Sequence, residues 1–126
     1  MIRLARIPGS FAVARLPPDA PIPAWVGGAL TSITRTVDEL SVVCEEARVP
    51  SAVDAVRDFA VCRVVGTIDF AVVGLMASLT RVIAEAGVSV LVISTFDTDY
   101  LLVRARDWPS AAAALASVAV LVDERQ

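Results

Sequence analysis

The chain has 126 residues, a formal net charge of −3 and 56% hydrophobic residues. That length accommodates one ordinary domain or two small halves with a shared core. The longest apolar runs, 88–93 and 111–122, are far shorter than the roughly 20 residues of a membrane-spanning helix. All basic residues are arginines and they are scattered singly, so neither a membrane nor a nucleic acid is an expected partner.

The N-terminal sequence MIRLARIPGSFAVARLPP lacks an uninterrupted apolar stretch and a cleavage pattern, so we expect a cytoplasmic protein without a signal peptide. Histidine is absent, which excludes Ser-His and Cys-His catalysis and His-based zinc sites. Cys44 and Cys62 lie in apolar, strand-like runs. They are predicted to be buried hydrophobes, with a disulfide as the alternative.

The first part of the chain predicts two hairpins. Residues 2–16 contain the β-type runs IRLARI and FAVARL, separated by Pro8, Gly9 and Ser10. Residues 17–28 hold prolines and glycines that exclude a regular element, and Trp25 among them is expected to cover an apolar surface. Polar and apolar residues then alternate in 30–36 and 39–46, around a turn at Val37 and Asp38. The polar segment 45–57 is the expected boundary between two halves, 1–57 and 58–126.

The second half begins with a predicted strand at 59–66, followed by a loop. A helix is predicted over 74–86, where one face carries Leu75, Leu79, Val82, Ile83 and Ala86. Gly87 is expected to end it in a left-handed conformation.

A strand at 88–94, apolar on both faces, is expected to be central in its sheet. A polar link at 95–98 leads to the strand YLLVRA. Asp107 as N-cap and Pro109 in the first turn predict a helix to about residue 117. A last strand is predicted over 118–122.

In order, the second half is strand, helix, strand, strand, helix, strand. This is the α+β, ferredoxin-like βαββαβ arrangement, in which one antiparallel sheet carries both helices on a single face. The first half, rich in β-hairpins and without a long helix, is open to interpretation as a degenerate version of the same unit.

The segment from Arg63 to Leu115 resembles the ACT domains of CASTOR-type, ACT-domain-containing bacterial proteins. The resemblance is sharpest in GLMASLTRVIAEAGVSVLVIST and the following FDTDYLLV. LARIPGSFAVARLPP and TRTVDELSVVCEE resemble the degenerate ACT-like unit that precedes the intact one in that family. The resemblance implies a regulatory protein that binds an amino acid or related small effector, pairs side by side as a homodimer and signals to an effector protein.

Two segments are candidate ligand-binding sites, the first implied by the resemblance and the second by several side-chain oxygens within a short span. The first is the loop 67–74 with the helix start, where backbone N–H groups would hold a carboxylate and Asp69 an ammonium group. Its residues are Asp69, Phe70, Val73, Gly74 and Leu75. The alternatives are that Asp69 caps a turn, Phe70 fills the core and Gly74 only permits a bend.

The second candidate segment is the strand end and the polar link that follows it. Its residues are Ile93, Ser94, Thr95, Phe96, Asp97 and Thr98. The alternative is a hairpin whose Asp and Thr side chains bond their own backbone, which is the favoured interpretation for Asp99. Metal binding by Asp97 and Asp99 is not favoured, because no other acidic residue lies nearby in the sequence.

No spacing pairs a nucleophile with a base, so no catalytic residue, no metal and no cofactor are expected. Glu45 and Glu46 are predicted to form a solvated edge, because consecutive strand residues point to opposite faces. The predicted function is a non-enzymatic effector-binding protein. The alternative is a ligand-free structural module that mediates oligomerisation.

Overall fold

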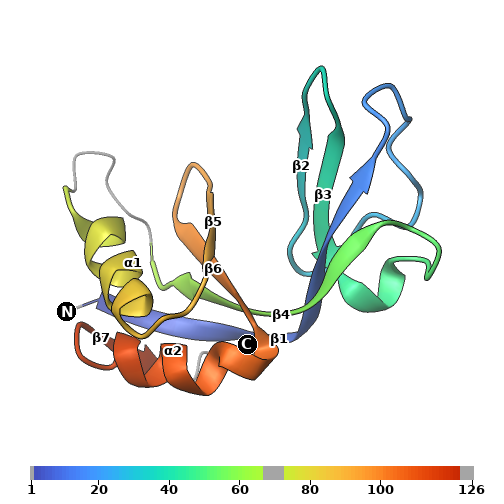
Figure 1. The fold of residues 1–126 in the computed structure, drawn as a ribbon. Helices are drawn as coiled ribbons and strands as arrows, with labels where there is room; N and C mark the ends of the chain where they lie inside the picture. Colours follow the sequence, from blue (N-terminus) through green and yellow to red (C-terminus); the bar gives the residue numbers. More distant parts are fainter. Residues whose placement is uncertain (1, 67–72, 123–126) are drawn as a thin grey trace. The chain divides into compact units, whose positions relative to one another are not determined.

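The computed structural model describes residues 2–66 and 73–122 and divides the chain into two compact units. We call Met1–Pro8 with Ala60–Gln126 the helical unit, and Gly9–Phe59 the hairpin unit. Two strands, β1 (Ile2–Leu16) and β4 (Ala55–Val64), run from one unit into the other (Figure 1). The N-terminal residues therefore share a unit with the C-terminal half, while the division of the chain at residue 57 stays a prediction.

The helical unit has the predicted order of strand, helix, strand, strand, helix, strand. The elements after β4 are α1 (Leu75–Glu85), β5 (Leu91–Ser94), β6 (Asp99–Arg104), the 3-10 helix η2 (Ala105–Asp107), α2 (Trp108–Leu115) and β7 (Ala119–Val122). β5 and β6 pair antiparallel, with Leu91 opposite Leu102. The result is a sheet-rich α+β unit with two helices.

The sheet of this unit holds one strand more than the predicted βαββαβ pattern. β1 neighbours both β4 and β7. The Val65 N–H donates to the Arg3 carbonyl at 2.9 Å, and Ile2 lies opposite Ala119 in a parallel pairing. The prediction of a purely antiparallel sheet is therefore wrong, because residue pattern indicates that a segment is a strand but not which distant strand it pairs with.

β1 is one continuous strand of 15 residues rather than the predicted hairpin. Gly9 has a φ of +98°, and Pro8 has no N–H to offer a neighbouring strand. Both residues lie where β1 passes from the helical unit to the hairpin unit. The residues that predicted a turn therefore make an irregularity in a strand.

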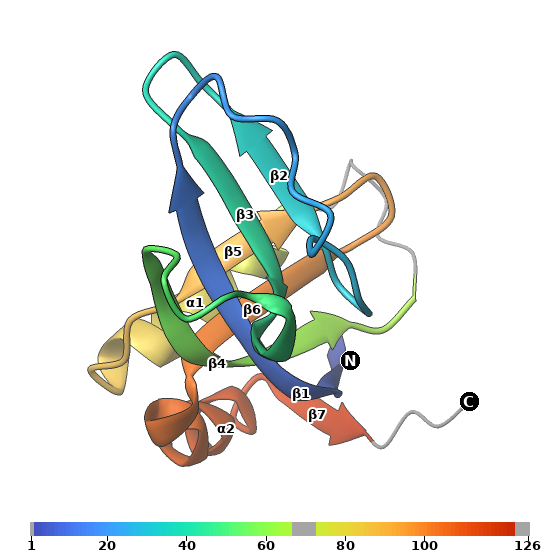
Figure 2. The same cartoon turned by 90° about the vertical axis from the view of Figure 1, so that its right-hand side faces the viewer.

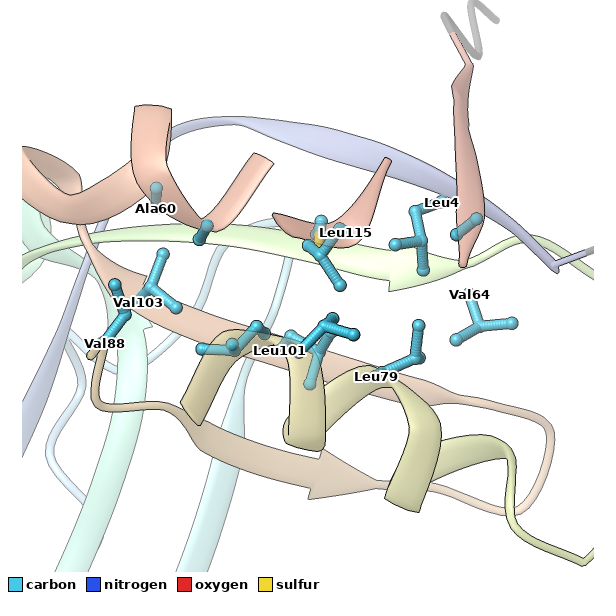
Figure 3. Packing of buried hydrophobic residues seen from close by; sticks show 13 residues of the cluster. Leu4, Ala60, Val64, Leu79, Val88, Leu101, Val103 and Leu115 are labelled. Carbon is cyan, nitrogen blue, oxygen red and sulfur yellow. The ribbon is translucent and has the colours of Figure 1, made fainter. Parts of the chain in front are cut away.

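The core of the helical unit lies between the sheet and both helices (Figure 3). Leu79, Val82 and Ile83 of α1 are buried there, as their spacing predicted, whereas Ala86 is exposed. Leu115 of α2 is fully buried in the same cluster. Ala60, Cys62 and Val64 of β4 contribute from the sheet, so this alternating set of β4 residues faces the helices.

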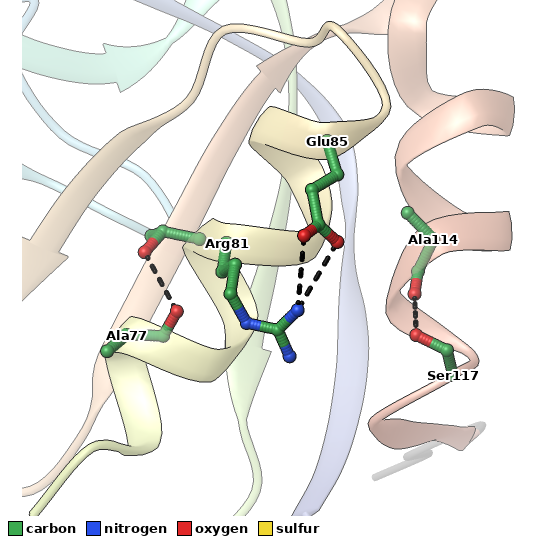
Figure 4. Close-up of polar contacts among 6 residues, drawn as sticks. Ala77, Arg81, Glu85, Ala114 and Ser117 are labelled. Atoms are coloured by element: carbon green, nitrogen blue, oxygen red, sulfur yellow. Dashed lines mark hydrogen bonds and ion pairs between the residues drawn. The ribbon is translucent and has the colours of Figure 1, made fainter.

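Both helices begin and end within about two residues of the predicted positions. Gly87 adopts a φ of +76°, and Val88 N–H donates to the Ile83 carbonyl at 3.2 Å, completing a glycine-ended helix cap. α2 starts after Asp107 with Pro109 in its first turn, although the Asp107 side chain makes no capping bond. α2 ends at Leu115, and the Ser117 hydroxyl donates to the Ala114 carbonyl at 2.7 Å (Figure 4).

β5 differs from its prediction in length and position. The strand covers only Leu91–Ser94 and is the last strand of the sheet, not a central one. Leu91 and Val92 are 44% and 40% exposed. An apolar strand sequence is compatible with a central position in a sheet or with an edge position that another chain can cover. Composition alone therefore does not predict the position of the strand in the sheet.

In the hairpin unit, β2 (Ser32–Arg35) and β3 (Leu40–Glu45) form the predicted hairpin (Figure 2). β3 also pairs antiparallel with the later part of β1. One sheet face forms a small core that the irregular segment 17–28 covers, with Trp25 packed against it as predicted. Figure 2 shows this segment as loop rather than helix.

Glu45 and Glu46 do not form the predicted solvated edge. A Glu45 carboxylate oxygen accepts from the Ala29 N–H at 2.8 Å. Glu46 Oε1 accepts from the Ser10 hydroxyl at 3.0 Å and from the Asp58 N–H at 2.6 Å. Each carboxylate therefore ties distant segments of the hairpin unit together.

Candidate functional site

The helical unit contains an open hollow of about 450 Å³ at one end of its sheet. We call it the Arg63 hollow. It is lined by Arg63, Val65, Gly66, Thr95, Asp97, Thr98 and Tyr100. These residues come from the end of β4, from the link between β5 and β6, and from β6 itself.

The hollow opens on the sheet face away from the helices. Because Cys62 and Val64 point into the helix-covered core, Arg63 between them points to the opposite face. Tyr100 lies on that face too, since its neighbour Leu101 belongs to the core. The site is therefore built on the sheet face opposite to the helices.

The turn 95–98 is held in place by its own backbone and by β4. Thr95 N–H donates to the Thr98 carbonyl at 2.8 Å, and the Thr95 hydroxyl oxygen accepts from the Thr98 N–H at 3.2 Å. The Thr98 hydroxyl donates to the Val64 carbonyl at 2.7 Å, and Thr98 is only 7% exposed. These bonds leave Asp97 at the rim, where it is exposed.

The lining carries both signs of charge and several hydroxyl groups. Arg63 presents a guanidinium group, which binds carboxylates with paired hydrogen bonds. Asp97 presents a carboxylate, which accepts from ammonium groups. The hollow therefore has the donor and the acceptor that a zwitterion such as a free amino acid requires.

The first predicted ligand-binding segment is only partly described by the structure. Asp69 and Phe70 lie outside the described residues. Val73 is 95% exposed and Gly74 has a φ of +84°, which supports the interpretation that this glycine permits a bend. Leu75 is the first residue of α1.

The second predicted segment contributes directly to the hollow. Thr95, Asp97 and Thr98 line it. Ile93 lies opposite Tyr100 in the β5–β6 pairing, while the Ser94 hydroxyl donates to the Asp99 carboxylate. Phe96 is 81% exposed at the tip of the turn.

Arg63 and Tyr100 were not among the predicted site residues. The available signal was a charged residue in the otherwise apolar run FAVCRVVG, in a strand whose alternate residues are buried. A charge at such a position is costly unless it has a partner or a function.

Neither cysteine lines this hollow. Cys44 and Cys62 are free and buried, so the disulfide alternative does not hold. Burial raises the pKa of the Cys62 thiol to about 12 and that of Cys44 above its ordinary value. Within residues 2–66 and 73–122, no three potential metal-ligating side chains form a group, and no helix is long and apolar enough to cross a membrane.

Comparison with known proteins gives two family matches. A model of the ACT domain matches residues 54–117. A second model, described as an N-terminal domain, matches residues 9–52. No curated protein matches the chain.

Solved structures extend these matches over the whole chain. Protein Atu0741 from Agobacterium tumefaciens is 38% identical, with a TM-score of 0.92 over 99% of this chain and 95% of that one. VC0802 from Vibrio cholerae is 20% identical, with a TM-score of 0.74 over 92% and 88%. The regulatory subunit of aspartate kinase from Thermus thermophilus is 12% identical, with a TM-score of 0.59 over 86% and 90%.

Proposed function

Because this chain belongs to the ACT-domain family, we propose that it is a regulatory protein that binds a free amino acid or a closely related small effector. The observation that carries the proposal is the Arg63 hollow, in which Arg63 and Asp97 supply opposite charges. The fold shared with the regulatory subunit of an aspartate kinase supports a regulatory role. No catalytic step is assigned to any residue.

In the proposed complex, the guanidinium of Arg63 binds the ligand α-carboxylate and Asp97 accepts from its ammonium group. Thr95 and Tyr100 offer further hydrogen bonds from the wall of the hollow. Asp69, Phe70 and Gly74 stay proposed ligand-binding residues from the sequence, and Asp69 and Phe70 lie outside the described residues. The Thr98–Val64 bond holds the turn against β4, which reduces the ordering that ligand binding requires of the turn.

The finer fold assignment is part of the same proposal. We interpret the helical unit as a ferredoxin-like ACT domain of CASTOR type with an added strand. The hairpin unit is then a degenerate ACT-like unit, since its strand order β2-β3-β1-β4 is that of a βαββαβ sheet. The cytoplasmic location remains an expectation from the sequence.

We further propose a homodimer that forms along β5. Among the described strands β5 is the last of the sheet, so no described strand pairs with its outer side, and Leu91 and Val92 are exposed beside it. Val92→Lys should convert the dimer to a monomer, as measured by light scattering. A wild-type chain that is monomeric at high concentration would contradict the dimer.

A ligand-free interaction module is the second candidate function. The exposed apolar edge of β5 favours it, because such an edge needs a partner whether or not the hollow binds anything. An effector protein that receives the signal is an alternative occupant of that edge.

The test of amino-acid binding is a thermal-shift screen against the twenty amino acids, followed by calorimetry. A ligand at a hundred times its Kd stabilises the folded state by about 2.7 kcal/mol, which raises the melting temperature measurably. Arg63→Gln and Asp97→Asn should each weaken binding about tenfold or more. Arg81→Gln is the matched control, because among the described residues Arg81 pairs with Glu85 on the exposed side of α1 (Figure 4).

If no amino acid at millimolar concentration changes the melting temperature, the effector proposal fails and the ligand-free module becomes the better function. Binding that Arg63→Gln leaves unchanged would instead move the site to another part of the chain.

A further inference from the structure

The hairpin unit repeats the construction of the Arg63 hollow. In the helical unit, the strand that supplies Arg63 contains FAVCRV (59–64), and in the hairpin unit β1 contains FAVARL (11–16). Phe, Ala, Val and Arg recur at the same places. Ala12 and Ala14 face the core of the hairpin unit as Ala60 and Cys62 face the other core, so Arg15 and Arg63 both lie on the opposite face.

The turn that carries the acidic residue is repeated as well. Thr36-Val37-Asp38-Glu39 in the hairpin unit corresponds to Thr95-Phe96-Asp97-Thr98 in the helical unit. Arg35 pairs with Leu40 at the base of the first turn, as Ser94 pairs with Asp99 at the base of the second. Both hairpins therefore close with a four-residue turn of the pattern Thr-x-Asp-x.

The hydrogen bonds of the two turns agree in detail. Thr36 N–H donates to the Glu39 carbonyl at 2.9 Å, which matches the 2.8 Å bond from Thr95 to Thr98. The Thr36 hydroxyl oxygen accepts from the Glu39 N–H at 3.2 Å, as the Thr95 hydroxyl does from Thr98. Val37 and Phe96 occupy the same place and are 91% and 81% exposed.

A second hollow lies where this correspondence predicts it. It measures about 380 Å³ and is lined by Arg15, Leu16, Pro17 and Asp38. Arg15 stands in the place of Arg63, and Asp38 in the place of Asp97. We call it the Arg15 hollow, and all its lining residues belong to the hairpin unit.

From this correspondence we propose that the Arg15 hollow is a second binding site for the same chemical class of ligand, a zwitterionic amino acid. The proposal rests on the proposed function of the Arg63 hollow. Arg15 binds the carboxylate and Asp38 the ammonium group. Within the described residues neither the Asp38 nor the Asp97 carboxylate has a hydrogen-bond or ion-pair partner, so both are available to a ligand.

The Arg15 hollow is the weaker of the two sites. Arg15 forms an ion pair with Asp54, and both side chains are about two-thirds exposed, at 69% and 66%. A ligand carboxylate has to replace Asp54, although an exposed pair of this kind holds its arginine only loosely. The Arg15 hollow also has no counterpart of Tyr100, because Ser41 occupies the equivalent position in β3.

Site-resolved NMR of the full chain tests the proposal, with each of the twenty amino acids as the probe. An amino acid that shifts the amide signals of Asp97 and Thr98 should, at higher concentration, also shift those of Asp38 and Glu39. Arg15→Gln should weaken the second set of shifts about tenfold or more and leave the first set unchanged. Arg63→Gln should do the reverse.

Asp54→Asn provides the matched gain-of-binding variant. It removes the competing carboxylate, so affinity at the Arg15 hollow should rise about two- to fivefold. Shifts confined to the turn 95–98 would overturn the second site while the proposed function stands. Shifts at 36–39 that survive Arg15→Gln would also overturn it, whereas an absence of shifts at both turns would overturn both proposals.

Discussion

Each unit contains an antiparallel hairpin beside a longer strand, but the two units differ in what covers the sheet. In the helical unit, α1 and α2 pack on one sheet face over a large cluster of buried residues. In the hairpin unit, the corresponding face is covered by a proline-rich irregular segment with Trp25, over a smaller cluster. A sheet face can therefore be kept from water by helices or by an irregular segment. Truncating a buried side chain is expected to lower the free energy of unfolding by different amounts under the two covers.

The largest expected effect comes from removing one buried leucine side chain under each cover. Leu79→Ala under the helices and Leu40→Ala under the irregular segment each delete a fully buried side chain. Such changes cost about 2–5 kcal/mol, and the cost is highest where the surroundings cannot collapse into the cavity. We expect Leu79→Ala near the upper end of that range and Leu40→Ala near the lower end, in urea unfolding. Val37→Ala, at a 91% exposed position, is the control, and a larger loss for Leu40→Ala would contradict the comparison.

The next effect concerns the turn of the Arg63 hollow. Thr98→Val keeps the shape of the side chain but leaves the Val64 carbonyl without its 2.7 Å hydrogen bond. Loss of a buried bond of this kind should lower the free energy of unfolding by about 1–3 kcal/mol. Thr34→Val on exposed β2 should change it by less than about 0.5 kcal/mol. Equal effects of the two changes would show that the turn does not depend on this bond.

Substitution of two glycines with positive φ compares the end of α1 with the irregular segment 17–28. Gly87 has open space where a Cβ would lie, so Gly87→Ala should cost only the backbone strain of about 1–2 kcal/mol. At Gly28 a Cβ would overlap the Glu45 side chain. Gly28→Ala should therefore cost more, because it also displaces the carboxylate that accepts from Ala29. Thermal unfolding of both variants measures the difference, and the opposite ranking would mean that Glu45 moves aside freely.

The smallest expected effect is a difference in thiol labelling rate, for which each unit contains one cysteine. Burial raises the pKa of both thiols, that of Cys62 to about 12. A thiol with a raised pKa stabilises the folded state below its unfolded value of 9.0, and this contribution is lost as the pH rises from there towards 12. At pH 8 both thiols should react only when their unit opens. Cys44 under the irregular cover should be labelled faster than Cys62, as measured by mass spectrometry, and labelling of Cys62 first would contradict this order. Equal rates in urea are the control.

Local signals predicted much of the helical unit. The spacing of Leu79, Val82 and Ile83 predicted the buried face of α1, and Gly87 predicted its end, because helix periodicity and caps depend on neighbouring residues. The hairpin of β2 and β3 followed from alternation around Asp38 for the same reason. Of the candidate site, the turn 95–98 was predicted from its polar residues, but Arg63 and Tyr100 were not, since their approach to that turn depends on strand pairing.

The sequence by itself determined the order of elements from β4 onward, the absence of histidine and the composition of both turns. Only the tertiary structure decided that β1 is a single strand shared by two units, that β5 lies at an edge, and that each Thr-x-Asp-x turn lies beside an arginine of another strand. The physical reason is that side-chain pattern specifies which face of a strand is buried. The choice of partner strand depends on the packing of the whole chain.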